Sequence, residues 1–242
     1  MSAKLLYLED SYKKTIESKI VAVEAESEGK WKVALEETIF YPLGGGQPTD
    51  QGTMKSDSWE GKVYLALMKD GDVWHHVQSE SEPKVGETVT GELNWDRRYK
   101  NMKVHSAGHI IDFGIHALGY SPESLMPVKG DHGKKAFIEY AGKTEKGNDE
   151  LRKEIEDKAN ELVKQDLAFS IKFMSLEELE KETIYLQPGL PSNKPLRALT
   201  LEGIGTVADG GTQVKKTSEV GKIIIKDLTV EDGSTILKYG IE

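Results

Sequence analysis

The sequence predicts an α+β protein in which a small β-barrel-like domain precedes a domain of mixed helices and strands. Short apolar segments separated by turn residues fill the chain to about residue 92, and this spacing is typical of a small barrel or sandwich. Beyond it, apolar residues at helical spacing alternate with further short strands. That mixture favours an α+β domain with a mainly antiparallel sheet. We therefore divide the chain into residues 1–92 and 93–242.

Composition places the chain among ordinary globular proteins. Its 242 residues are 37% hydrophobic and 30% charged, which is enough for a sizeable core. The formal net charge of -9 argues against a generic basic nucleic-acid coat, but it leaves room for a local basic groove. Without cysteine there is neither a disulfide framework nor a thiolate metal ligand. The first residues lack a signal-peptide core and no apolar run approaches membrane-spanning length, so we expect a cytoplasmic protein with no membrane partner.

The N-terminal domain is expected to consist of short strands. A hairpin signal at residues 28–30 joins the first two, and turn residues at 69–72 separate two later ones. The expected strands are residues 20–25, 31–35, 62–67, 73–77 and 87–91.

A glycine-rich segment, residues 40–52, interrupts these strands. Gly44, Gly45 and Gly46 expose backbone N–H groups without Cβ bulk, so a ligand can approach the main chain closely. No Gly-Lys-Ser/Thr follows, which excludes a Walker-type phosphate loop. From these residues alone, the segment is either a ligand-binding loop or a plain connector.

The second domain opens with a helix that carries two histidines four residues apart. Apolar residues recur at helical spacing across residues 104–118, so His105 and His109 share one face. One helical turn can supply two ligands to a metal such as zinc in this way. Ser106 stands where a metalloprotease helix has Glu. The pair is either a metal-binding turn or a coincidence of one structural and one exposed histidine.

A basic segment leads into this helix. Four cations lie within seven residues, namely Arg97, Arg98, Lys100 and Lys103. Trp95 and Tyr99 are interleaved with them, so the segment is suited to contact a phosphate backbone and a stacked base. The alternative is a solvated helix face.

The rest of the second domain mixes both kinds of element. An amphipathic helix is expected over residues 148–165, and a short helix begins at the serine cap Ser175. The expected strands are residues 134–140, 171–174 and 197–201, with a closing hairpin of residues 222–226 and 234–239.

Four segments together resemble the AlaX family, the free-standing relatives of the alanyl-tRNA synthetase editing domain. Residues 40–52 are similar to its glycine-rich motif, and residues 94–98 resemble its basic lead. Residues 105–109 match its His-x-x-x-His motif. Residues 209–221 align with Cys-Gly-Gly-Thr-His-Val and the Thr-x-Glu-Ile-Gly tail. The segments occur in the family's order over nearly the whole chain, and a β domain ahead of the editing domain resembles the medium-length type.

The resemblance implies a trans-editing hydrolase that cleaves the ester of mischarged tRNA(Ala), most often tRNA(Ala) charged with serine. A small apolar pocket rejects an added hydroxyl only on the order of a hundredfold, so a second, hydrolytic site must remove the error. A zinc ion there would hold the substrate or polarise a water. The resemblance assigns substrate binding to Gly44, Gly45, Gly46, Gln47 and Thr212, and tRNA binding to Arg97, Arg98, Lys100 and Lys103.

The sequence departs from the family at the second metal motif, where Asp209 and Gln213 replace Cys and His. Asp is a competent hard ligand, whereas Gln is a poor ligand for zinc. Three interpretations stay open. In the first, His105, His109 and Asp209 bind one divalent metal, zinc before iron or manganese, with Gln213 at most a weak partner. In the second, the fold hydrolyses without metal. In the third, it is a non-catalytic module that binds tRNA or a synthetase.

Overall fold

The computed structural model describes residues 3–242, which form two compact units. One unit ends at Asn101 and the other begins at Met102, so the boundary lies inside helix α1 (Trp95–Ala117). The sequence placed it ahead of this helix, at residue 92. The start of α1 belongs with the barrel because Arg98 binds groups of the N-terminal unit. The α+β class with mainly antiparallel sheets is confirmed.

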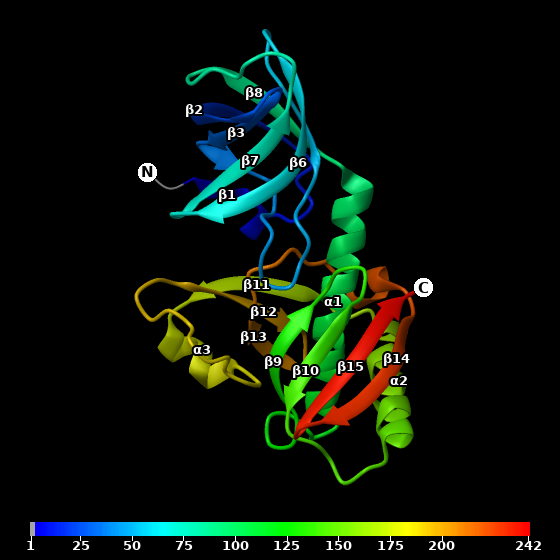
Figure 1. Cartoon of the computed structure of the whole chain (residues 1–242). Helices are drawn as coiled ribbons and strands as arrows, with labels where there is room; N and C mark the ends of the chain where they lie inside the picture. The colour runs from blue at the N-terminus through cyan, green and yellow to red at the C-terminus, as the bar shows by residue number, and fades with distance from the viewer. Residues whose placement is uncertain (1–2) are drawn as a thin grey trace. The chain divides into compact units, whose positions relative to one another are not determined.

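The N-terminal unit is a closed six-stranded antiparallel barrel, seen in blue and cyan in Figure 1. Its order around the barrel is β2 (Thr15–Ser27), β3 (Lys30–Leu35), β7 (Asp72–Gln78), β6 (Glu60–Lys69), β5 (Gly52–Lys55) and β8 (Thr88–Leu93). A short 3-10 turn, η1 (Leu6–Leu8), and a parallel pair of β1 (Lys4–Leu5) with β4 (Glu37–Thr38) complete the unit.

Alternating side chains explain this barrel. Along the first half of β2 and along β8, every second residue is buried, and Ile16, Ile20 and Val89 enter one apolar core. The predicted hairpin is confirmed at Gly29, whose φ of 66° suits glycine. Strand β5 was not predicted because only Met54 of its four residues is buried, which leaves no alternating pattern to read.

The C-terminal unit contains two antiparallel sheets and three shorter helical segments beside α1. One sheet has the order β14 (Ile223–Glu231), β15 (Ser234–Ile241), β10 (Phe137–Ala141) and β9 (Met126–Asp131). The other has the order β11 (Phe169–Met174), β12 (Leu196–Leu201) and β13 (Gly205–Ala208). The helical segments are α2 (Asn148–Lys164), α3 (Leu176–Glu182) and the 3-10 turn η2 (Thr217–Val220). Strands β9 and β13 were not predicted, because β9 contains Pro and Gly and β13 is only four residues long.

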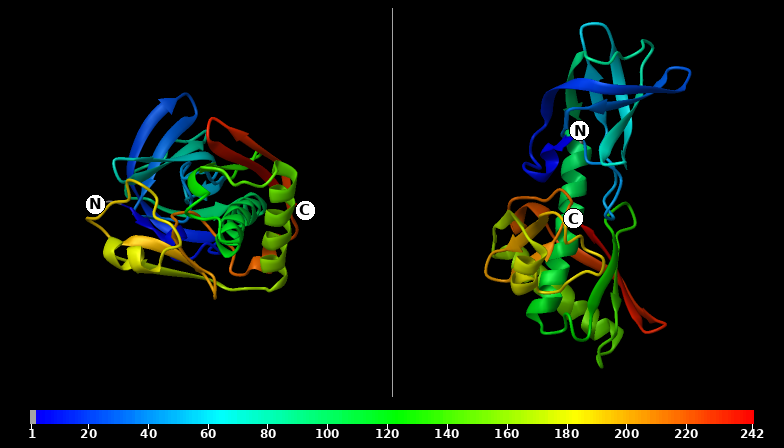
Figure 2. Two further views of the ribbon diagram at one scale, coloured as in Figure 1. Left: turned by 90° about the horizontal axis from the view of Figure 1, so that it is seen from below. Right: turned by 90° about the vertical axis from the view of Figure 1, so that its left-hand side faces the viewer.

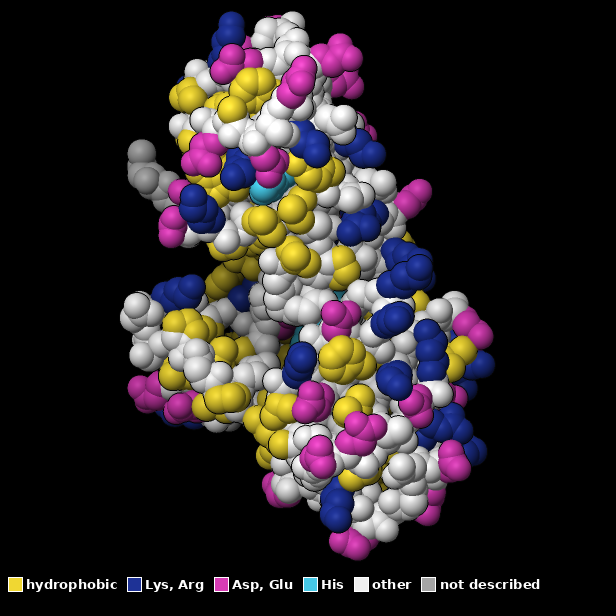
Figure 3. Space-filling model, viewed as in Figure 1, with side chains coloured by type: hydrophobic (Ala, Val, Ile, Leu, Met, Phe, Trp, Pro, Cys, Tyr) yellow, Lys and Arg dark blue, Asp and Glu magenta, His cyan; other side chains and the backbone are white. Residues whose placement is uncertain are grey.

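Helices α1 and α2 lie side by side and cover one face of the four-stranded sheet (Figures 1 and 2). Gly114 of α1 brings the two helices close, because a Cβ there would lie 3.5 Å from the backbone nitrogen of Ala159. The hydroxyls of Tyr140 and Tyr239 reach α1 from the sheet. On the opposite face of the sheet, Figure 3 shows Lys and Arg side chains together with acidic and apolar ones. None of the helices in residues 3–242 is long and apolar enough to cross a membrane.

Candidate metal centre

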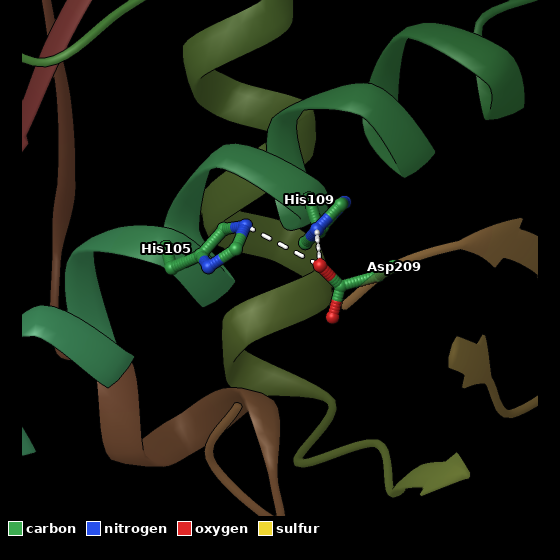
Figure 4. Close-up of side chains that lie close together, drawn as sticks. All are labelled: His105, His109 and Asp209. Carbon is green, nitrogen blue, oxygen red and sulfur yellow. Dashed lines mark ion pairs between the residues drawn. The ribbon is translucent and has the colours of Figure 1, made fainter. Parts of the chain in front are cut away.

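Helix α1 holds His105 and His109 on one face, as their spacing predicts. Both side chains are buried, and their rings stack with centroids 5.0 Å apart. Asp209 approaches them from the segment that follows β13, where its backbone nitrogen donates to the carbonyl of Arg197. Figure 4 shows both imidazoles turned toward the carboxylate of Asp209. Residues from opposite ends of the C-terminal unit therefore meet at one point.

The geometry of these three residues fits a divalent cation. The Nε2 atoms of His105 and His109 lie 3.5 and 3.4 Å from Oδ1 of Asp209, and the three ligand atoms are all within 4.8 Å of one another. Ligands held about 2.1 Å from one tetrahedral ion are separated by roughly 3.4 Å. Both ring nitrogens of His109 are buried and make no hydrogen bond within the described chain. A buried nitrogen without a hydrogen bond requires an explanation, and a cation bound at Nε2 beside Asp209 supplies one for that nitrogen.

The protonation states of His105 and Asp209 suit such a site. Burial lowers the pKa of His105 to about 3, so its ring is a neutral nitrogen donor. Burial alone would raise the pKa of Asp209, but His105, His109 and Arg197 together hold it well below its usual range. Burial alone would lower the pKa of His109, but Asp209 and Asp112 more than offset that effect, so this pKa is raised. A metal bound to His109 would therefore displace a proton. Asp209 therefore presents a full negative charge to the two imidazoles.

The second carboxylate oxygen of Asp209 has other partners. Its Oδ2 accepts hydrogen bonds from Nη1 of Arg197 at 2.9 Å and from Nε2 of Gln213 at 3.0 Å. Ser106, between the two histidines, donates to Oε1 of Gln213 at 2.6 Å. The amide oxygen is the atom of Gln213 that could bind a metal, and here it accepts a hydrogen bond instead. Gln213 thus orients Asp209.

Gly211 gives His105 its room. A Cβ at this position would lie 2.1 Å from Cε1 of the His105 ring, a distance that real structures do not show. The backbone nitrogen of Gly211 also donates to Oδ1 of Asp209 at 2.9 Å. The absence of a Cβ thus makes room for His105, while the backbone of the same residue holds Asp209.

Besides Arg197, two buried groups beside the site were missed by the sequence reasoning. Asp112 accepts hydrogen bonds from Tyr140 at 2.7 Å and Tyr185 at 3.2 Å, and its Oδ2 lies 3.8 Å from Nδ1 of His109. Burial raises the pKa of Asp112 to about 6, against the opposing effect of His109. Its position three residues after His109, on the same helix face, is a signal that could have revealed it.

The other missed group is His132, which follows β9. Its ring stacks on His105 with centroids 4.2 Å apart, and its Nδ1 shares a hydrogen bond of 2.5 Å with the hydroxyl of Tyr239. No spacing rule links residues this far apart in the chain, so the sequence offered no signal for this contact.

The predicted substrate-binding residues lie in both units. Thr212 is fully buried between Asp209 and Gln213 in the chain. In the N-terminal unit, the carbonyl of Gly44 accepts a hydrogen bond from the Tyr41 hydroxyl at 2.9 Å, and Gly45 and Gly46 have φ angles of 55° and 77°. Gln47 is buried. Their role in substrate binding, and the expectation that this loop faces the histidine helix, stay predictions.

The predicted tRNA contact of Arg98 is wrong. Its side chain is fully buried, with Nε bound to both carboxylate oxygens of Asp50 and Nη1 donating to the carbonyl of Ser11 at 3.0 Å. A guanidinium enclosed in this way cannot reach a phosphate, because breaking a buried ion pair is strongly unfavourable. Among the others, Lys100 is exposed while Arg97 and Lys103 are half-buried. For these three, phosphate contact stays a prediction.

Comparison with known proteins agrees with the sequence motifs. Residues 3–97 match the family model described as tRNA synthetases class II (A). Over 226 residues the chain is 32% identical to the alanyl-tRNA editing protein AlaX-M of Saccharolobus solfataricus, covering 91% of this chain and 90% of that protein. The chain belongs to the AlaX family. It is also 32% identical to AlaX-M of Methanosarcina mazei, again over 90% of that protein.

The synthetases themselves are longer. The chain is 32% identical over 237 residues to the alanine–tRNA ligase of Methanobrevibacter smithii, of which it covers 26%. The resemblance to AlaX inferred from the four motifs is confirmed, and the medium-length type agrees with the coverage of the two AlaX-M proteins.

Proposed function

We propose that this AlaX family member is a cytoplasmic trans-editing deacylase that hydrolyses the ester between serine and tRNA(Ala). Its relatives are named as alanyl-tRNA editing proteins, which supports the substrate class. The observation that carries the proposal is the convergence of His105, His109 and Asp209, with donor atoms within 4.8 Å of one another. We further propose that they bind one divalent metal, zinc first.

The metal, when bound, supplies Lewis-acid polarisation of a carbonyl or a water. The chain's own residues prepare the site for it. His105 contributes a neutral nitrogen, and Asp209 contributes a negative charge directed by Arg197 and Gln213. In the reaction, water adds to the ester carbonyl carbon and the bond to the ribose oxygen breaks. One water proton passes to that ribose oxygen, which frees the tRNA and serine.

Part of the tRNA contact is proposed for the start of α1. Lys100 is exposed there, and Arg97 is half-buried with Nε bound to the carbonyl of Thr49. Trp95 and Tyr99 stack on each other with centroids 5.5 Å apart, one helical turn along. Cations beside an aromatic surface suit a phosphate backbone with an unpaired base. Lys103 continues the same helix.

A deacylation assay tests the proposal. Purified protein is given tRNA(Ala) charged with serine or with alanine, first after chelator treatment and then after return of zinc. We expect zinc-dependent release of serine with alanine largely spared, and loss of release in Asp209→Asn. Binding of tRNA without hydrolysis in every metal condition would instead identify a non-catalytic binding module. Hydrolysis unaffected by chelation and by Asp209→Asn would identify a metal-free hydrolase.

A further inference from the structure

We propose that His132 is a positioning residue for the metal centre, fixing the ring of His105 so that its Nε2 faces Asp209. The inference rests on the proposed function, since it concerns the same site. It extends that function by adding a third histidine, and its partner Tyr239, to the residues on which metal binding depends.

The rings of His105 and His132 are in close contact, and their planes are nearly parallel. Their centroids are 4.2 Å apart with planes inclined by 20°, whereas His132 and His109 are separated by 6.3 Å. His132 is not among the residues whose ligand atoms cluster within 4.8 Å, so it touches a ligand without joining the set. An imidazole stacked in this way restricts the neighbouring ring to one plane.

His132 is itself held by Tyr239. Its Nδ1 shares a hydrogen bond of 2.5 Å with the Tyr239 hydroxyl, which also donates to the carbonyl of Val104 at 3.1 Å. Val104 immediately precedes His105 on α1. The four-stranded sheet is therefore linked to the helix at the residue next to the ligand. Partners of this kind orient metal-binding histidines in many sites.

Two glycines make room for this arrangement. A Cβ at Gly108 would lie 2.7 Å from the Tyr239 hydroxyl and 2.8 Å from Cε1 of His132. A Cβ at Gly130 would lie 2.9 Å from Nε2 of His132. On its other side, His105 abuts Gly211, where a Cβ would lie 2.1 Å from Cε1. The His105 ring is thus enclosed between His132 and the backbone of Gly211.

The test uses cobalt(II) as a spectroscopic probe of the full-length protein. The variants are His132→Ala, which removes the stack, and His132→Phe, which keeps a ring but loses the hydrogen bond to Tyr239. His116→Ala is the matched control, because His116 is a half-buried histidine of α1 bonded to the Ser121 carbonyl, away from the metal residues. Cobalt affinity comes from competition with a chelator, and the visible absorption bands report the ligand geometry.

We expect His132→Ala to weaken cobalt binding about tenfold and to change the visible bands, as loss of a partner that orients a ligand does. His132→Phe should lose less cobalt affinity than His132→Ala. His116→Ala should have the cobalt affinity and the visible bands of wild type. Wild-type affinity and bands in His132→Ala would overturn the proposal. Equal losses in both His132 variants would overturn the stacking role, because the effect would then come from the hydrogen bond to Tyr239.

A metal-free measurement separates this proposal from the proposed function. In NMR spectra of the apoprotein, the ring protons of His105 should be shielded by the stacked ring, and His132→Ala should remove that shielding. If wild type binds no cobalt, the metal-dependent function fails while the spectra still decide whether His132 places His105. Unchanged His105 signals in His132→Ala would overturn the positioning role.

Discussion

The side-chain nitrogen of Gln213 donates a hydrogen bond to Oδ2 of Asp209 over 3.0 Å. The two residues that stand where the resemblance to the family motif predicts Cys and His therefore bind each other. Asp209 offers its other oxygen to His105 and His109, and Ser106 and Arg197 complete the support. Asp209 and Gln213 thus belong to one hydrogen-bonded unit, and the proposed metal set consists of two nitrogens and one carboxylate oxygen.

The pair of Asp209 and Gln213 predicts that the protein binds zinc more weakly than a version with Cys and His at these positions. A carboxylate keeps the negative charge of a thiolate beside a divalent ion, but the amide of Gln213 loses the nitrogen donor of a histidine. Asp209→Cys combined with Gln213→His should therefore hold zinc through dialysis against a mild chelator that strips most of it from wild type. The measurement is metal content by elemental analysis, with Gln213→His alone as the control. Full zinc in wild type after the same dialysis would contradict the prediction.

A second prediction uses two adjacent glycines. Gly211→Ala places a methyl group against the His105 ring, so the ring must move and metal binding should be lost. The protein should also be destabilised, by about 1–3 kcal/mol. Gly210→Ala is the matched control, because a Cβ there meets no atom within 4 Å. Thermal unfolding and zinc content of the two variants provide the check. If the two variants had equal thermal stability and equal zinc content, a side chain at position 211 would not disturb His105, and the prediction would be wrong.

The sequence predicted some parts of this site and could not predict others, for physical reasons. The helical placement of His105 and His109 follows from local periodicity, which does not need the rest of the fold. Asp209 was identified because residues 209–221 resemble the second metal motif of the family. His132 and Arg197 could not be found, because strand pairing in the two sheets brings them to the site from distant positions. The prediction for Arg98 was wrong because the sequence pattern does not distinguish an arginine buried in an ion pair with Asp50 from an exposed one.

The corrected role of Arg98 gives a third prediction. Arg98→Ala leaves Asp50 charged and buried, which should destabilise the barrel by about 3–5 kcal/mol. All four tryptophans lie between residues 31 and 95, so tryptophan fluorescence during denaturant unfolding follows the N-terminal unit. Lys100→Ala should leave this unfolding unchanged, because Lys100 is exposed.

The same pair of variants separates stability from tRNA binding. If Lys100 contacts one phosphate, Lys100→Ala should flatten the logarithmic salt dependence of tRNA affinity by about one unit. Arg98 lies inside the protein, so Arg98→Ala, measured under conditions where the variant is still folded, should keep the wild-type slope although it removes a positive charge. A flattened slope in folded Arg98→Ala would restore Arg98 as a tRNA contact.

The last prediction concerns acid stability of the barrel and rests on His75. This residue is fully buried, with Nδ1 2.8 Å from the carbonyl of Val33 and Nε2 2.8 Å from the hydroxyl of Thr38. Nδ1 must carry the proton to donate to the carbonyl, so Nε2 accepts from Thr38 and the ring is neutral. Burial lowers the pKa of His75 to about 4, against the opposing effect of the Val33 carbonyl. In the unfolded chain the pKa returns to its ordinary value of about 6.5.

Between these two values the unfolded chain binds more protons than the folded one. The stability contribution is therefore fully present above about pH 6.5, and it is lost as the pH falls toward 4. The loss is on the order of 3 kcal/mol. His75→Gln keeps an acceptor for Thr38 but does not titrate, so its unfolding free energy should depend less on pH across this range. Denaturant unfolding followed by tryptophan fluorescence at a series of pH values gives the difference between wild type and variant. Parallel curves for the two proteins would mean that His75 does not control the acid stability of the barrel.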